Sequence, residues 1–282
     1  MPLLSMKDIL EDAKKKNYAV PAFNIDNMEI IQAVLQVAYE ESSPVILAIG
    51  QGAIKNGNFE ALTAVAKRIG NELSLPIALH LDHGSSYGQV IRCIREGFTS
   101  VMIDGSHLPL EENIRLTRKV IEAANPVGIS VEAELGRIAG VEDDISLEEE
   151  NAKTVDVEDV KKFLTEVDVD ALAIAIGSAH GWYKGEPKLN FSLLSDINKL
   201  TEIPLVLHGG SGIPEHLIKK AISLGINKIN VATEIRRAFI NNITSTDHSK
   251  YDIYKYLDHA RNGVKKIVRN KIILFDSRNR AY

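Results

Sequence analysis

The segment Ile77-Ala78-Leu79-His80-Leu81-Asp82-His83-Gly84 begins as an apolar β-type run and ends in ionisable side chains followed by glycine. Two later segments share this design: residues 171–176 precede Gly177-Ser178-Ala179-His180-Gly181, and residues 203–207 precede His208-Gly209-Gly210-Ser211-Gly212. Each places a histidine at or just past the end of a predicted strand, and the glycine that follows lets backbone or ligand approach closely. Zinc held by three imidazoles keeps a fourth position open for water or substrate, so the pattern predicts a metal site. Strand-end histidines without a ligand are the alternative, and their threefold recurrence argues against it.

Apolar runs alternate with amphipathic patterns along the chain. The runs predict strands at residues 19–24, 45–48, 76–82, 100–104, 130–134, 171–176, 204–207 and 226–231. Helices are predicted at 28–41, 59–69, 87–96, 110–124, 157–166, 191–200, 215–224 and from 233, with a first helix starting near Ser5. This alternation indicates an α/β fold, a closed (β/α)8 or TIM barrel. An open doubly wound sheet is the alternative, but no G-x-G-x-x-G motif follows the first strand.

We expect residues 1–282 to form one domain, with the barrel over about 1–240 and extra C-terminal helices over about 250–282. The tail exceeds what a barrel needs, so it is expected to pack on the outside or at a subunit contact. The connection at residues 136–155 is long and rich in Asp and Glu. Long loops in compact folds are often lids over active sites, and a solvated acidic excursion is the alternative.

Polar side chains gather at the C-terminal ends of the predicted strands, where TIM barrels carry their active sites. They are Asn24, Asp82, His83, Asp104, Glu134, His180, His208 and Asn230. Buried carboxylates are costly unless they are paired or bound to metal, so this concentration indicates function. Glycine-rich residues 209–212 and the junction at 230–233 follow the last two strands, where barrels often bind phosphate. A simple tight turn is the alternative for each.

The composition excludes several classes of protein. The 282 residues carry 33 basic and 38 acidic side chains, a net charge of −5, so nucleic acid is not an expected partner. No apolar run approaches the roughly 18 residues of a membrane span, and residues 1–7 lack the apolar region of a signal peptide. Cys93 is the only cysteine and is expected in a helix core. We therefore expect a cytoplasmic protein without disulfides.

Taken together, these segments resemble the class II, zinc-dependent ketose-bisphosphate aldolases, and most closely the tagatose-bisphosphate aldolase branch. The similarity covers nearly the whole chain. It is carried by residues 18–24 (YAVPAFN), 79–83 (LHLDH), 100–107 (SVMIDGSH), 131–136 (VEAELG), 141–144 (VEDD), 175–181 (AIGSAHG) and 230–234 (NVATE).

The resemblance implies reversible cleavage of D-tagatose 1,6-bisphosphate to dihydroxyacetone phosphate and D-glyceraldehyde 3-phosphate, with fructose 1,6-bisphosphate as the alternative substrate. It implies a catalytic zinc on His83, His180 and His208, and a second metal position at Asp104 and Glu134. It also implies that Asp82 transfers the proton at the C4 hydroxyl, and that Glu142 exchanges the proton at C3 of dihydroxyacetone phosphate. Because we expect no lysine within the strand cores, the metal route is favoured over a Schiff base.

The resemblance further implies a substrate site and partners. Substrate contacts are expected from Asn24, Gly181, Gly209, Gly210, Ser211, Asn230, Val231, Ala232 and Thr233, with a monovalent cation, Na⁺ or K⁺, near Gly181 and Ser211. A homo-oligomer, dimer or tetramer, is expected. The tagatose branch often works with a non-catalytic partner subunit.

The two sugars differ only at C4, and the sequence gives conflicting indications. Ala232 favours tagatose, since fructose enzymes commonly carry Asp or Asn there. Gly84, Gly210 and Tyr183-Lys184-Gly185 instead resemble the fructose enzymes. A non-catalytic aldolase-like subunit is a further alternative, weakened because no expected ligand is missing. A zinc hydrolase of the amidohydrolase kind would favour a His-x-His pair on the first strand, which has Phe23-Asn24.

Overall fold

The computed structural model describes residues 3–143, 145–148, 152–183, 185–246 and 251–281. Within these residues, eight parallel strands close into a barrel in the order β1-β11-β10-β8-β5-β4-β3-β2. They are β1 (Val20–Asn24), β2 (Val45–Ile49), β3 (Ile77–Gly84), β4 (Ser100–Ile103), β5 (Ser130–Leu135), β8 (Ala171–Ile174), β10 (Leu205–Leu207) and β11 (Ile226–Val231). The predicted TIM barrel is confirmed.

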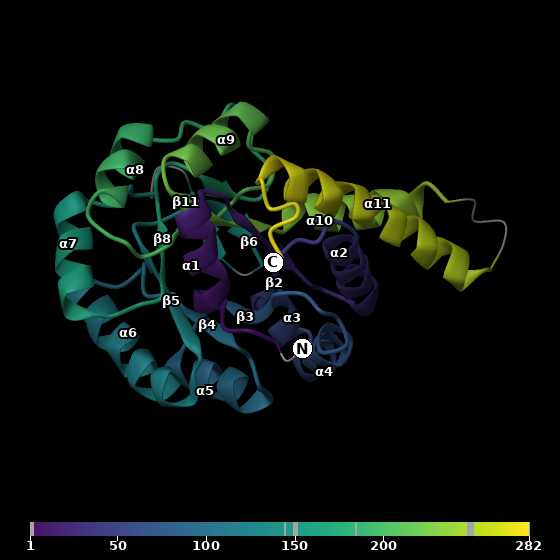
Figure 1. Cartoon of the computed structure of the whole chain (residues 1–282), viewed down its shortest axis with the longest axis horizontal. Coiled ribbons are helices and arrows are strands. Elements are labelled where there is room, and N and C mark those ends of the chain that lie inside the picture. Colours follow the sequence, from purple (N-terminus) through teal and green to yellow (C-terminus); the bar gives the residue numbers. More distant parts are fainter. Residues whose placement is uncertain (1–2, 144, 149–151, 184, 247–250, 282) are drawn as a thin grey trace.

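Helices surround this barrel, and Figure 1 shows α5 to α9 in sequence around its outside. The helices that follow barrel strands are α2 (Met28–Glu40), α3 (Gln51–Lys55), α4 (Phe59–Gly70), α5 (Tyr87–Glu96), α6 (Leu110–Ala124), α7 (Val157–Glu166), α8 (Phe191–Asn198), α9 (Glu215–Ser223) and α10 (Thr233–Thr244), and a short 3-10 turn, η1, spans Asn125–Val127. The short helix α3 lies in a stretch for which the sequence predicted nothing.

The first helix, α1 (Met6–Lys16), closes the N-terminal end of the barrel. Its buried Met6, Leu10 and Ala13 form a cluster with small and β-branched side chains inside the barrel, among them Val20 and Ala78 at the starts of β1 and β3. A separate core lies between the strands and the outer helices. Because one end is filled by apolar side chains, only the C-terminal end can present polar groups to a ligand.

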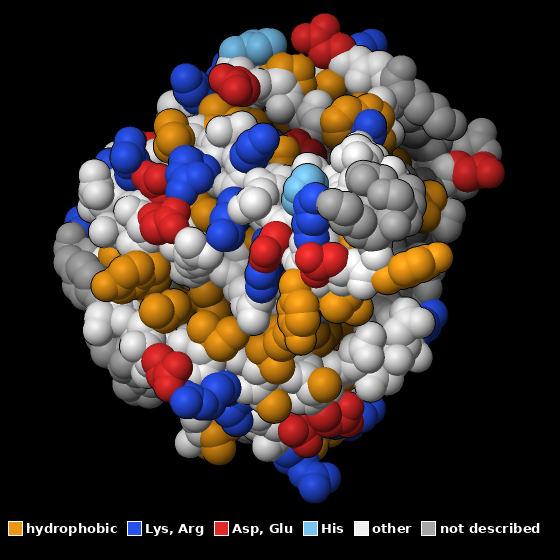
Figure 2. Space-filling model, turned by 90° about the vertical axis from the view of Figure 1, so that its right-hand side faces the viewer, with side chains coloured by type: hydrophobic (Ala, Val, Ile, Leu, Met, Phe, Trp, Pro, Cys, Tyr) orange, Lys and Arg blue, Asp and Glu red, His pale blue; other side chains and the backbone are white. Residues whose placement is uncertain are grey.

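The C-terminal tail is helical, as predicted. Helix α11 (Ile253–Leu274) packs against α10 and α2, and Figure 1 shows α10 and α11 extending together away from the barrel. Figure 2 faces this side and shows hydrophobic side chains among charges of both signs. Tyr251, just before α11, and Ile253 and Tyr254 in its first turn are exposed by 101%, 63% and 77%. No helix within the described part of the chain is long and apolar enough to span a membrane.

The predicted acidic loop at 136–155 contains regular structure that the sequence analysis missed. Strands β6 (Ala139–Glu142) and β7 (Ile145–Leu147) form an antiparallel hairpin. Strand β6 also pairs in parallel with β9 (Ala179–His180), so that Gly140 lies opposite His180. The hairpin is thereby joined through backbone hydrogen bonds to the loop that carries a predicted metal ligand. Alternation of apolar and polar residues is weak here, which explains why the strands were not predicted.

Candidate active site

Alternating residues on three strands bring polar side chains into the barrel interior. Side chains at positions i and i+2 of a strand share a face. The pairs are His80 and Asp82 on β3, Glu132 and Glu134 on β5, and Lys228 and Asn230 on β11, and each of these residues is 3% exposed or less. The first member of each pair lies deeper in the barrel and was missed by the sequence analysis. The same two-residue spacing from the predicted members could have identified it.

The end of β3 is bent in a way that places Asp82 and His83 in the same site. Successive side chains of a regular strand point to opposite faces. The register between β3 and β4 shifts between Leu81 and Gly84, and His83 has a φ of 49°. A non-glycine residue with this backbone is strained, and such strain clusters at functional sites. A Cβ on Gly84 would lie 2.3 Å from the Met102 carbonyl oxygen, so glycine is required at this bend.

The three predicted metal-binding histidines meet at the mouth of the barrel. The ring centroid of His83 lies 4.6 Å from that of His208 and 5.0 Å from that of His180. Nδ1 of His208 lies 2.9 Å from Nε2 of His83. The nitrogens that the three rings could offer to one ion all lie within 4.8 Å of one another, and all three residues are buried. The structure therefore brings together the residues for a three-histidine metal site.

A second group of possible ligands shares His83 with the first. Asp104 and Glu134 lie beside this ring, with Asp104 Oδ2 2.9 Å from His83 Nδ1 and Glu134 Oε2 4.0 Å from it. Burial raises the pKa of Glu134, and the charge of Asp104 raises it further. Burial opposes ionisation of Asp104 too, but hydrogen bonds from His83 and Ser106 lower its pKa.

The chemistry of these donors fits a divalent cation. Glu134 Oε2 is buried without a hydrogen-bond partner and lies 3.5 Å from His208 Nδ1. An unpaired buried carboxylate oxygen is unfavourable, and a cation among these atoms would compensate it. Imidazole nitrogens and carboxylate oxygens are the ligands that zinc accepts.

Glu132 and Lys228 lie deeper in the barrel than the three histidines, and Glu132 contacts both His208 and Lys228. The Glu132 carboxylate lies 3.0 Å from Nε2 of His208 and accepts a 2.7 Å hydrogen bond from the Lys228 ammonium. Burial disfavours the ionised carboxylate, but Lys228 and His208 outweigh it and lower the pKa of Glu132 to about 2. An ionised Glu132 fixes His208 so that Nδ1 faces the metal position, as carboxylates commonly do for metal-binding histidines.

Lys228 corrects one expectation. We expected no lysine within the strand cores, yet Lys228 is fully buried on β11. Its ion pair with Glu132 accounts for the burial. The lysine therefore serves as a charge partner within the barrel.

Asp82 is held by two amides. Nδ2 of Asn24 donates to one carboxylate oxygen of Asp82 at 3.0 Å, and Nδ2 of Asn230 donates to the other at 2.9 Å. The amide oxygens of both asparagines are buried without hydrogen-bond partners. Although burial disfavours the charged form, His83 and His208 hold the pKa of Asp82 below its usual range. The site thus contains an oriented carboxylate beside two free hydrogen-bond acceptors.

The glycine-rich turn after β10 lies against the start of α10. The hydroxyl of Ser211 accepts from the backbone N–H of Glu234, and the Glu234 carboxylate accepts from the N–H of Gly212. Gly209 has a φ of 68°, and a Cβ there would lie 2.2 Å from the Ala179 carbonyl oxygen. The hydroxyl of Tyr183 joins this turn to the loop carrying Gly181, since it accepts from Ala179 N and donates to Gly209 O.

The predicted substrate-binding residues differ in what they present. The side chain of Val231 is fully buried in the core between strands and helices, so only its backbone could contact a ligand. Ala232 is 6% exposed and precedes the first turn of α10, which begins at Thr233. Gly210 is confined by the Asn230 carbonyl and Ile229. The structure brings these residues beside the predicted phosphate turn.

Parts of three sequence predictions fall outside what the structure describes. The backbone of Glu142 ends β6, but its side chain lies outside the described atoms. Lys184 of the fructose-like Tyr183-Lys184-Gly185 segment is also outside the described residues, as are Asp144, Glu149 and Glu150 of the acidic loop.

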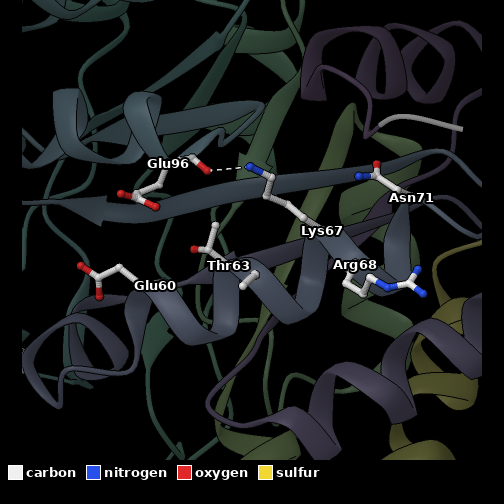
Figure 3. Close-up of a pocket in the computed structure, with 7 residues that line it drawn as sticks. Glu60, Thr63, Lys67, Arg68, Asn71 and Glu96 are labelled. Carbon is white, nitrogen blue, oxygen red and sulfur yellow. Dashed lines mark hydrogen bonds between the residues drawn. The ribbon is translucent and has the colours of Figure 1, made fainter.

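A separate pocket lies on the outside of the barrel, between α4 and α5 (Figure 3). Lys67 crosses it and donates to the Glu96 carbonyl oxygen at 2.9 Å, while Glu60 and Arg68 line it with opposite charges. This pocket contains none of the predicted site residues. Glu60 pairs with Arg92 and Arg68 pairs with Glu72, both outside the pocket lining, so these side chains do not converge on a ligand position.

Comparison with known proteins gives a consistent result. The family described as class II fructose-bisphosphate aldolase matches residues 4–280. A probable fructose-bisphosphate aldolase from Bacillus subtilis (strain 168) is 47% identical over 287 residues, covering 100% of both chains. The fructose-bisphosphate aldolase of Thermus caldophilus is 44% identical over 305 residues, covering 99% of this chain and 100% of the relative. Among solved structures, the YdjI aldolase from Escherichia coli K12 superposes with a TM-score of 0.89 at 35% identity, covering 99% of this chain and 100% of that one. A match of this extent, in sequence and in fold, shows that the chain belongs to the class II fructose-bisphosphate aldolase family.

Proposed function

We propose that this protein is a metal-dependent aldolase that cleaves fructose 1,6-bisphosphate to dihydroxyacetone phosphate and glyceraldehyde 3-phosphate. The observation that carries the proposal is the cluster of His83, His180 and His208 beside Asp82 at the open end of the barrel. The relatives described above are named for fructose bisphosphate, so the fructose alternative is better supported than the tagatose branch that Ala232 favoured. A non-catalytic role is disfavoured because no expected ligand is missing.

In this proposal His83, His180 and His208 hold the catalytic zinc. When bound, zinc acts as a Lewis acid that polarises a substrate carbonyl and stabilises negative charge developing beside it. Asp104 and Glu134 would form a second position for a divalent ion, beside His83. The proposed monovalent cation, Na⁺ or K⁺, would lie near Gly181 and Ser211.

Two carboxylates of the protein, Asp82 and Glu142, would transfer the protons of the reaction. Asp82 would accept the proton of the C4 hydroxyl, because its carboxylate is ionised and oriented by Asn24 and Asn230. The free amide oxygens of these two asparagines can accept hydrogen bonds from substrate hydroxyls. Glu142 would return a proton to C3 of the dihydroxyacetone phosphate half.

Phosphate would bind where the turn at 209–212 meets the start of α10. Backbone N–H groups at a helix N-terminus favour anions, and α10 is twelve residues long. Gly181, Gly209, Gly210 and Ser211 would contribute from one side, and Asn230, Val231, Ala232 and Thr233 from the other. The closeness of the two segments supports this assignment.

Sugar selectivity is expected to be modest. A site that hydrogen-bonds a distinguishing hydroxyl discriminates strongly, and the methyl group of Ala232 cannot form such a bond. We expect the protein to cleave fructose 1,6-bisphosphate, with tagatose 1,6-bisphosphate accepted at a kcat/KM within about 100-fold. The Ala232→Asp variant should shift the ratio toward fructose by about 1–3 kcal/mol.

The test is to measure kcat/KM for both sugars in both proteins. A native protein that does not cleave fructose 1,6-bisphosphate would overturn the proposed function. An unchanged ratio in Ala232→Asp would show that residues such as Gly84 and Gly210 determine the preference.

We further propose that residues 1–282 form one domain that assembles into a homo-oligomer, dimer or tetramer, through its outer helices. Apolar side chains are exposed on α10 and α11, including Ile240 at 56% and Tyr254 at 77%. Exposed apolar side chains of this kind often mark contacts between proteins. Light scattering at working concentration should give a mass of at least twice the 31.1 kDa chain. A monomer would contradict this, and full activity of the isolated chain would exclude a required partner subunit.

We also propose that the protein is cytoplasmic. Cys93, the only cysteine in the sequence, is buried as a free thiol. This is consistent with a protein of the reducing cytoplasm.

A further inference from the structure

A cluster of ionic contacts joins the β6–β7 hairpin to the rim of the barrel. Asp143, the residue after β6, has one carboxylate oxygen 2.9 Å from the Arg236 guanidinium on α10. Arg236 also binds Asp26 in a two-contact arrangement, at 2.7 and 3.0 Å. We call these three side chains the Asp143 clamp. It connects the hairpin, the β1–α2 connection and α10, which are far apart in the sequence.

The second carboxylate oxygen of Asp143 is held as well. It accepts a 2.8 Å hydrogen bond from the backbone N–H of Gly52 in α3. A Cβ on Gly50 or Gly52 would lie only 2.8 or 2.6 Å from the Asp143 carboxylate. These two glycines therefore leave room for the Asp143 side chain, and each of its carboxylate oxygens has a partner, Arg236 for one and the Gly52 N–H for the other. The Asp143 side chain is only 10% exposed, although it belongs to a long connection.

The clamp and β9 anchor the hairpin at two separate places. On one side, Gly140 pairs with His180, a residue of the three-histidine cluster. On the other, Asp143 is fastened to the rim near β1 and β2. The backbone of Glu142 lies between these anchors. Its position relative to the barrel mouth therefore depends on both.

We propose that Asp143 and Arg236 are positioning residues that hold the Glu142 backbone at the barrel mouth. The inference rests on the proposed role of Glu142 in proton exchange. Arg236 is itself oriented by the two contacts that its Nε and Nη2 make with Asp26, and the same Nη2 lies 2.9 Å from the Asp143 carboxylate. Without the ion pair between Asp143 and Arg236, the hairpin keeps its pairing with β9 and the hydrogen bond from Gly52 but loses its link to α10. Small displacements of a catalytic group cost large factors in rate.

The experiment compares Asp143→Asn, Arg236→Gln and Arg236→Lys with the native protein. The first reading is backbone hydrogen exchange of residues 139–147 in the free protein, which needs no substrate. We expect faster exchange in Asp143→Asn and Arg236→Gln, with partial recovery in Arg236→Lys because it keeps the charge. The second reading is C3 proton exchange of dihydroxyacetone phosphate, which should fall about 10- to 100-fold in kcat with less change in KM.

Arg118→Gln is the matched control, since Arg118 pairs with Glu166 at 2.7 Å on outer helices away from the mouth. It should change neither reading. Bound metal and thermal stability are measured in every variant, so that misfolding is distinguished from displacement of the hairpin. Unchanged hydrogen exchange in Asp143→Asn and Arg236→Gln would show that the Asp143 clamp does not hold the hairpin, whatever the protein's activity. If backbone hydrogen exchange is faster in these variants but proton exchange at C3 is unchanged, Asp143 and Arg236 do not position Glu142 for the reaction. Failure of the native protein to cleave the sugar bears instead on the proposed function.

Discussion

We expect replacement of His83 by alanine to abolish the proposed cleavage of fructose 1,6-bisphosphate and the binding of the proposed divalent ion, while the barrel remains folded. His83 belongs to both groups of possible ligands, so its loss disrupts both. With zinc the ligand nitrogens should lie at about 2.0–2.1 Å from the ion. The measurements are metal content by mass spectrometry, turnover, and circular dichroism. Exhaustive chelation of the native protein should give the same loss of turnover, and zinc should restore it.

The control is His216→Ala, because His216 is exposed on the outer helix α9. It should keep both metal and activity. An intermediate effect is expected for Glu132→Gln, which removes the charge that orients His208 and should weaken metal binding about 10- to 100-fold. Full turnover after complete removal of metal would disprove the metal-dependent mechanism.

Replacing Asp82 by alanine will block carbon–carbon cleavage yet preserve proton exchange at C3 of dihydroxyacetone phosphate. Asp82 is the ionised group that Asn24 and Asn230 orient, and loss of a general base typically costs about 10²- to 10⁴-fold in rate. The reverse result is expected for Glu142→Ala, in which C3 exchange should slow sharply. The two half-reactions are followed by release of dihydroxyacetone phosphate and by loss of tritium or deuterium from C3.

Asp82→Asn serves as the isosteric control, since it keeps the shape of the side chain and removes its charge. It should be as defective in cleavage as Asp82→Ala. Metal content must be unchanged in all three variants, because Asp82 lies next to His83 in the chain. If Asp82→Ala and Glu142→Ala lose both half-reactions equally, the two proton-transfer roles are wrongly assigned.

The barrel could be predicted because each strand is a short apolar run bounded by turns. In a parallel sheet covered by helices, both faces of a strand are buried, so the runs are nearly continuous. The hairpin β6–β7 and the short α3 escaped prediction because their residues lack such a pattern. Periodicity is informative only where one face of an element is consistently apolar.

The polar interior shows the limit of this reasoning. The strand-end residues Asp82, Glu134 and Asn230 were identified from position alone, whereas Glu132 and Lys228, two residues earlier on their strands, were not. A buried Glu or Lys is unfavourable by itself, and only the opposite strand reveals the partner that permits it. The clamp of Asp143, Arg236 and Asp26 has no sequence signal, because its members come from the turn after β6, helix α10 and the β1–α2 connection, which are far apart in the chain.

The sequence alone determined the order of the eight barrel strands and of the main helices between them, the histidines at the strand ends and the family resemblance, because these depend on local pattern. Tertiary structure decided which side chains meet. The left-handed backbone at His83 places it beside Asp82, and closure of the barrel brings Glu132 on β5 to Lys228 on β11. Distances between residues far apart in the chain depend on the register and tilt of the strands, and neither can be read from a short stretch of sequence.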